Sequence, residues 1–217
     1  LLDRKTNNFL GAMSENNGSV SIAWVDVSTG CFKSRNIQED NKSNRKQLLA
    51  NFLLRMNFSE LLISEDFDLD LIVEEWHSIL KKQPSSLFHY PSCLDQILSY
   101  YSIVSLEGVG TFSDGEIKAA AVLLSYLKLT QCGKIPILSM IQTETQYNFL
   151  EIDYFTQKSL EIFKNLSGGS EGSLISCLDE TKTACGARLL KQRVIEPFYK
   201  IEQIQDRYDL TNWILEN

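Results

Sequence analysis

The sequence predicts a mixed α/β domain followed by an all-helical segment, and three observations lead to this fold class. Asn16-Asn17-Gly18 is a strong hairpin signal, because these residue types accept the positive φ angles of a tight turn. Short apolar strands then alternate with helical stretches, which is typical of a mixed sheet covered by helices. Beyond a boundary near residues 133–145 the pattern is entirely helical.

Three antiparallel strands are expected at the start of the domain. A short strand from residue 8 to 13 leads into the hairpin, and Val20–Val27 is rich in β-branched and aromatic residues. Ser28-Thr29-Gly30 is expected to turn the chain again. Cys31–Ile37 then returns as the third strand.

Helices and short strands alternate in the next part of the chain. Strands are expected at Glu60–Ser64, which is apolar and therefore buried, and at Ser86–Tyr90, as an edge strand. The expected helices are Leu48–Met56, Leu69–Leu80 with Lys81 and Lys82 at its end, and Leu94–Tyr101.

The clearest helix is Ser113–Thr130. Ser113 and Glu116 have the S-x-x-E spacing of a capping box, in which the two side chains satisfy free backbone amides of the first turn. Gly133 and Pro136 are expected to end the helix. Its apolar face consists of Ile117, Ala120, Ala121, Leu124 and Leu127.

Three further helices are expected in the second part, and local signals predict their ends. They are a helix capped by Asp153 that runs to about Lys164 and ends at Gly168-Gly169, a helix over Ala184–Val194 between Thr183 and Pro197, and a last helix over Ile201–Glu216.

Composition excludes several classes of function. The chain has 217 residues, 43% of them hydrophobic and 23% charged, which is usual for a globular protein, and no apolar run is long enough for a membrane span. A net charge of −7 argues against nucleic acid as the main partner, and the basic cluster Lys42–Lys46 is expected to be a solvated loop. The five scattered cysteines have no metal-binding spacing, which indicates free thiols in a reducing cytoplasm.

Several motifs resemble the MutS family of DNA mismatch-repair proteins. In the first part these are A-W-V-D-V-S-T-G-C-F at Ala23–Phe32 and E-L-L-I-S-E-D at Glu60–Asp66. In the second part they are the helix start at Ile152–Ile162, N-L-S-G-G-S-E-G-S-L at Asn165–Leu174, and C-G-A-R-L-L-K-Q-R-V-I-E-P at Cys185–Pro197. The order β-β-β-α-β-α of the first part resembles the RNase H-like fold of the MutS connector domain.

The resemblance implies a place inside a larger machine. Residues 1–132 are expected to form the connector domain, and residues 133–217 the first helices of the lever domain. The implied partners are the remaining MutS domains, MutL and a second MutS copy, with mismatched DNA bound only by other domains of the parent. No cofactor is expected in this segment, because it has no Walker A motif, whereas the cytoplasmic parent would use ATP and Mg²⁺.

Asp26 has two interpretations. Nucleases of the RNase H-like fold hold metal ions with a carboxylate on a central strand, where Asp26 is expected, but they need two or three further carboxylates. The favoured interpretation is structural, because Asp26 opens D-V-S-T-G and its carboxylate can accept amides of the turn. The alternatives kept open are a metal-dependent nuclease or resolvase using Asp26 and a free-standing adaptor domain. The further carboxylates available are Glu60, Glu65, Asp66, Asp114 and Glu116.

The second part contains three structural candidates. Gly168 and Gly169 are expected to supply left-handed backbone positions in a helix–helix connection, since the segment around them lacks the lysine of a phosphate loop. Arg188 follows Gly186 and Ala187 at a helix start, and it is expected to pair with a carboxylate between helices.

Overall fold

The structure, a computed structural model, describes residues 9–16, 18–130, 137–144, 150 and 152–216. Contacts between Cα atoms divide these residues into two units, the first from Phe9 to Glu144 and the second from Leu150 to Glu216. The domain boundary expected between residues 132 and 133 stays a prediction.

A hairpin and a returning strand begin the first unit, as predicted. β1 (Phe9–Asn16) pairs antiparallel with β2 (Ser19–Asp26), and β2 pairs antiparallel with β3 (Cys31–Gln38). All of β2 except Asp26 is buried, because helices cover both faces of the sheet.

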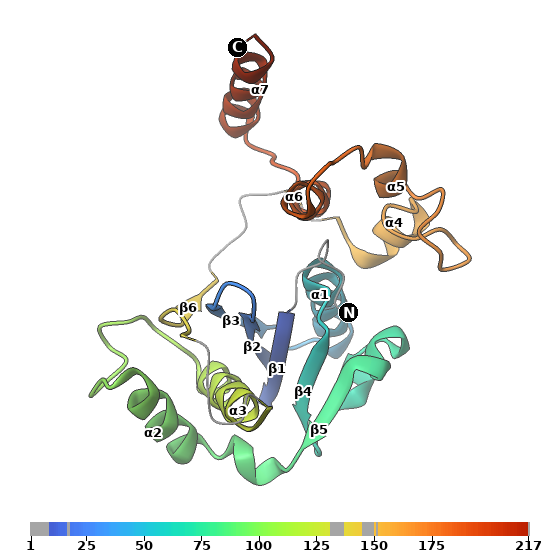
Figure 1. The fold of residues 1–217 in the computed structure, drawn as a ribbon. Coiled ribbons are helices and arrows are strands. Elements are labelled where there is room, and N and C mark those ends of the chain that lie inside the picture. Colours follow the sequence, from blue (N-terminus) through green and yellow to red (C-terminus); the bar gives the residue numbers. More distant parts are fainter. Residues whose placement is uncertain (1–8, 17, 131–136, 145–149, 151, 217) are drawn as a thin grey trace. The chain divides into compact units, whose positions relative to one another are not determined.

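Three more strands join in parallel. β4 (Glu60–Ser64) pairs with β1, β5 (Leu80–Gln83) with β4, and β6 (Gln142–Thr143) with β3. The order across the sheet is therefore β5-β4-β1-β2-β3-β6 (Figure 1). The first five strands, with β2 running against the other four, have the arrangement of the RNase H-like fold, so the predicted fold class is confirmed.

The two faces of the sheet carry different helices. α3 (Asp114–Thr130) packs on one face, with α2 (Tyr90–Tyr101) against its outer side. α1 (Lys42–Met56) packs on the other face, where the Trp24 ring lies edge-on to Phe52 with 5.2 Å between ring centroids. Successive side chains of a strand point to opposite faces, so β2 contributes to both cores.

The predicted helix Leu69–Leu80 is wrong. The segment forms two 3₁₀ turns, η1 (Leu69–Leu71) and η2 (Glu74–Ile79), before Lys81 and Lys82 enter β5 rather than a helix end. β5 forms because β4 offers it a parallel partner, a long-range pairing that no local signal shows.

The predicted edge strand Ser86–Tyr90 is also wrong. Residues there form η3 (Ser85–Phe88), after which α2 begins at Tyr90, earlier than predicted. Pro91 in the first turn of α2 favours this start, because its missing N–H would have no helical partner there. α1 likewise begins within the supposed loop, since the Asn41 side chain accepts the amides of Ser43 and Asn44.

The second unit is helical, as predicted. Thr183 caps α6 (Ala184–Ile195) and α7 (Ile201–Glu216) has the predicted bounds. Asp153 caps α4 (Tyr154–Ser159), but this helix ends well before Lys164, because Glu161 has a φ of 50° and turns the chain. A short helix that was not predicted, α5 (Leu174–Leu178), follows.

Candidate functional site

The Asp26 carboxylate lies in the turn between β2 and β3. Its Oδ1 accepts hydrogen bonds from the backbone N–H of Ser28 at 2.9 Å and from the Ser28 hydroxyl at 2.6 Å. The carbonyl oxygen of Asp26 accepts the amides of Thr29 at 3.2 Å and Gly30 at 2.8 Å. These contacts support a role for Asp26 as an organiser of the turn.

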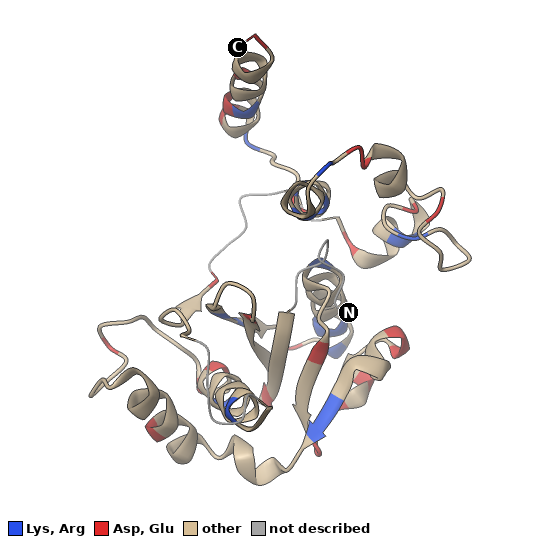
Figure 2. Cartoon of the chain, in the orientation of Figure 1, with Lys and Arg blue, Asp and Glu red and all other residues tan. Residues whose placement is uncertain are grey.

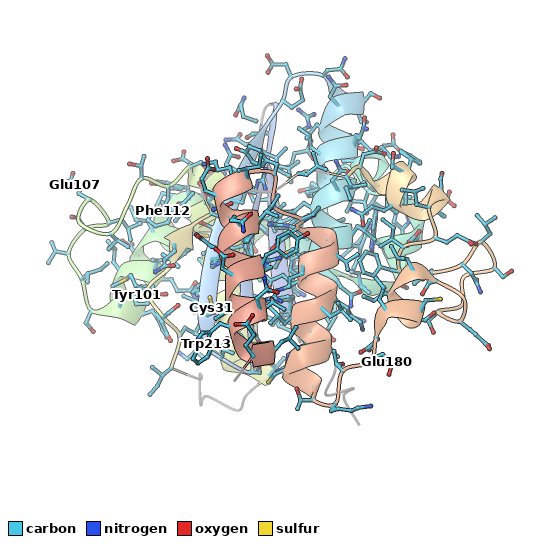
Figure 3. The ribbon with its side chains drawn as sticks, turned by 90° about the horizontal axis from the view of Figure 1, so that it is seen from above. Cys31, Tyr101, Glu107, Phe112, Glu180 and Trp213 are labelled. Carbon is cyan, nitrogen blue, oxygen red and sulfur yellow. The ribbon has the colours of Figure 1, made fainter. Side chains whose placement is uncertain are left out.

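Gly30 brings this turn against residues 137–139. Its φ is +73°, and a Cβ atom at this position would lie 2.4 Å from the carbonyl oxygen of Ile137. The Gly30 carbonyl accepts the amide of Ser139 at 2.8 Å, and the Ser139 hydroxyl accepts the amide of Phe32 at 3.0 Å. Tyr101, labelled in Figure 3 at the end of α2, donates its hydroxyl to the Ser139 carbonyl at 2.8 Å.

Two of the carboxylates considered for a metal site, Glu60 and Asp66, have other partners. Glu60 accepts a hydrogen bond of 2.7 Å from the Tyr126 hydroxyl, which raises the pKa of Tyr126, and Asp66 accepts one from Ser85. Within the described ranges, no three His, Cys, Asp or Glu side chains lie close enough together to hold a metal ion. Asp26 is therefore not part of a carboxylate cluster there.

Glu116 lies at the centre of a buried polar network. Its Oε2 accepts the N–H and the hydroxyl of Ser113, both at 2.9 Å, and its own N–H donates to Ser113 Oγ at 3.3 Å, which confirms the predicted capping box. Its Oε1 accepts the Ser34 hydroxyl at 2.8 Å. Ser21 Oγ lies 3.1 Å from Ser113 Oγ and donates to Asn36. The network joins α3 to two strands.

An ion pair that sequence reasoning missed lies at the end of β6. The Arg55 guanidinium donates to both oxygens of the Glu144 carboxylate, at 3.2 and 2.5 Å. Arg35 lies 3.7 Å from the same carboxylate, and the Glu144 amide donates to the Ser34 carbonyl at 2.7 Å. Arg55 and Glu144 are 89 residues apart, so no local motif contains both.

The glycine-rich turn closes on Asn165. Gly168 has a φ of +86°, and its amide donates to the Asn165 carbonyl at 2.9 Å. Gly169 does not take the expected left-handed backbone, and its amide donates to Asn165 Oδ1 at 2.9 Å. The second left-handed position belongs to Gly172, with a φ of +80°. The segment is a hydrogen-bonded turn between α4 and α5.

Arg188 lies in the first turns of α6. Its guanidinium donates to the Sγ atom of Cys185 at 3.3 Å. The pairing of Arg188 with a carboxylate between helices stays a prediction.

Charged residues are interspersed along both units. Figure 2 shows both basic and acidic positions in each unit. Lys42 at the start of α1 pairs with Asp68 at 2.6 Å. None of the helices described in the structure is both long and apolar enough to cross a membrane.

The fold and these contacts define a class of protein. An RNase H-like sheet is followed by helices in the second unit. Asp26 is bonded within a turn, and Glu116 belongs to a cap and a buried network. This combination is that of an α/β domain with a helical extension.

Comparison with known proteins gives the family. The family model for MutS domain II matches residues 8–139, and the model for MutS domain III matches residues 155–217. The chain therefore belongs to the MutS family of DNA mismatch-repair proteins, and it consists of connector and lever sequence, as the resemblance implied.

Similar proteins are bacterial. The chain is 36% identical to the DNA mismatch repair protein MutS of Wolbachia pipientis wMel, covering 100% of the chain and 25% of that relative. It is 32% identical to the MutS protein of Dinoroseobacter shibae and 33% identical to that of a Ruegeria species, covering 100% of the chain and 24% of each relative. The chain thus spans about a quarter of the length of the curated relatives it matches.

Proposed function

We propose that this chain is a non-catalytic relay segment of a MutS mismatch-repair protein. In this role it transmits changes between the mismatch-binding domain and the ATPase domain of the whole protein. The observation that carries the proposal is the succession of two matches, domain II over residues 8–139 and domain III over residues 155–217.

The packing of the first unit supports a relay. α1 and α3 cover opposite faces of the sheet, and buried side chains fill the space between them. A close-packed core deforms little, so a displacement at one edge moves the whole unit. Residues 137–144 are hydrogen-bonded to the same sheet, and the second unit follows them in the sequence.

The proposed partners follow from the family. They are the other MutS domains, a second MutS copy and MutL. The surface proposed to bind MutL is that of the connector. The net charge of −7 supports the assignment of DNA binding to other domains. ATP and Mg²⁺ likewise belong to the parent, and its proposed location is the cytoplasm.

A chimera tests the relay. The chain would replace the matching quarter of the Dinoroseobacter shibae MutS protein in a strain lacking its own copy, with mutation frequency as the readout. The proposal expects a frequency close to that of the strain with intact MutS. A folded chimera that leaves the frequency at the deletion level supports the proposal if it binds mismatched DNA and ATP but has lost the coupling between the two. If that coupling is intact in such a chimera, the proposal is contradicted. Full repair without this segment contradicts it.

A binding measurement tests the MutL contact. The chain would be titrated with purified MutL from the same relative, with a MutS segment lacking the connector as control. Saturable binding by the chain alone supports the contact, and equal signals from chain and control argue against it.

A further inference from the structure

The last strand of the sheet is too short to hold itself in place. β6 pairs with β3 through only two residue pairs, Lys33 with Gln142 and Ser34 with Thr143. Even an isolated two-stranded hairpin is marginally stable in water, and this pairing is shorter still. Other contacts must therefore keep Gln142 and Thr143 at the sheet edge.

The residues just before β6 have anchors of their own. Leu138 and Ile141 are buried, with 6% and 3% of their surface exposed. Ser139 is held by Gly30, Phe32 and Tyr101. These contacts fix residues 138–141. At the end of β6 the Thr143 hydroxyl adds a long hydrogen bond of 3.4 Å to the Thr111 carbonyl.

The residue after β6 carries a stronger contact. Glu144 receives two hydrogen bonds from Arg55 of α1, whose side chain is 8% exposed against 18% for Glu144. The Arg55 guanidinium also lies over the Phe52 ring, 5.0 Å from its centroid, which fixes its position. A two-point arginine–carboxylate pair that is largely shielded from water is among the stronger polar contacts in proteins.

We propose that Arg55 and Glu144 form a latch that holds β6 on the sheet. While the latch is closed, the chain leaves the first unit after Glu144. When it opens, residues 142–144 detach while Leu138 and Ile141 stay buried, and the exit point moves back to Ile141. Each released residue extends the connection by at most about 3.3–3.6 Å.

The consequence for the relay rests on the proposed function. A closed latch keeps residues 142–144 on the sheet, so movement of the first unit is passed to the chain from Glu144 onward. An open latch frees residues 142–144 from the sheet, so less of that movement is passed on. The latch itself is a property of the first unit and exists whether or not the chain acts in repair.

Hydrogen exchange of the 217-residue chain tests the latch. The readout is the Glu144 amide, which donates to the Ser34 carbonyl. We expect Glu144→Gln to accelerate its exchange about tenfold or more, because a hydrogen bond to a charged group is replaced by weaker neutral ones. The Ser139 amide, bonded to Gly30, should keep its rate in the same sample.

Two further variants separate the latch from general destabilisation. Arg55→Met keeps an apolar stem near Phe52 and should accelerate exchange at Glu144, though less than Glu144→Gln does, because Arg35 stays 3.7 Å from the carboxylate. The double variant should exchange no faster than Glu144→Gln alone. Lys42→Gln breaks the exposed ion pair with Asp68 and should leave Glu144 unchanged.

Two outcomes would overturn the latch. One is unchanged exchange at Glu144 in both variants. The other is equal acceleration at Glu144, Ser139 and the amides of β2, which would mean that the unit loosens as a whole. Exchange needs no repair activity, so its result stays separate from the chimera test of the proposed function.

Discussion

The Ser34 hydroxyl donates a hydrogen bond of 2.8 Å to the Glu116 carboxylate and so joins β3 to the first turn of α3, 82 residues further along the chain. Both residues are buried, at 0% and 2% exposure. The same carboxylate caps its own helix through Ser113. One side chain thus fixes both the start of α3 and its position on the sheet.

Replacing Glu116 should destabilise the first unit strongly. Glu116→Ala leaves Ser34 without its carboxylate partner and removes half of the capping box, so we expect a loss of about 2–4 kcal/mol in the free energy of unfolding. Urea denaturation followed by circular dichroism measures it. The control is Glu107→Ala, since Figure 3 shows Glu107 at the periphery of the chain, and its effect should stay within about 0.5 kcal/mol. Equal effects of the two variants would contradict the network.

Gly30→Ala should also destabilise the chain. The added Cβ would lie 2.4 Å from the Ile137 carbonyl oxygen, at a φ of +73° that alanine rarely adopts. We expect a loss of about 1–3 kcal/mol, the usual cost of a strained backbone position. Gly108→Ala is the matched control, because its Cβ would meet no atom within 4 Å. Thermal unfolding of both variants decides whether this close approach exists in solution.

Local signals explain which elements the sequence predicts well. The hairpin follows from the Asn-Gly pair, the start of α3 from Ser113 and Glu116, and the start of α6 from Thr183. Each signal lies within a few residues of the feature that it specifies. The predicted end of α3 at Gly133 and Pro136 lies outside the described residues.

Long-range pairing explains what the sequence does not reveal. β5 depends on the free edge of β4, and the pair of Arg55 and Glu144 joins residues 89 positions apart. Asp26 was found through its turn motif, whereas Arg55 lies in an ordinary amphipathic helix. Its role becomes visible only when β6 is placed beside β3.

Asp26→Asn separates a turn organiser from a catalytic carboxylate. The amide oxygen of asparagine still accepts the Ser28 N–H, but more weakly, so we expect a loss of about 0.5–1.5 kcal/mol in unfolding free energy. Nuclease assays on RNA–DNA hybrids and branched DNA with Mg²⁺ or Mn²⁺ should give the same background for both proteins. Cleavage by the unchanged chain that disappears in Asp26→Asn would favour the nuclease alternative instead.

The last helix offers a test of how the second unit is stabilised. None of the residues of α7 from Ile201 to Glu216 is buried, and Trp213 and Leu215 are 63% and 79% exposed. Three residues of α7, Gln203, Ile204 and Arg207, are partly buried, and the Arg207 guanidinium lies 4.0 Å from the centroid of the Phe198 ring. A 16-residue helix with so little packing is marginally stable in water.

We therefore expect amides of α7 to exchange faster than those of α3 by about two orders of magnitude or more in a dilute sample. Hydrogen exchange with mass spectrometry compares peptides covering 201–216 and 114–130 directly. An apolar surface of this kind also favours association, so protection of α7 should rise with protein concentration while that of α3 stays constant. Slow exchange of α7 at every concentration would show that the chain covers this helix by itself, contrary to the packing described for α7.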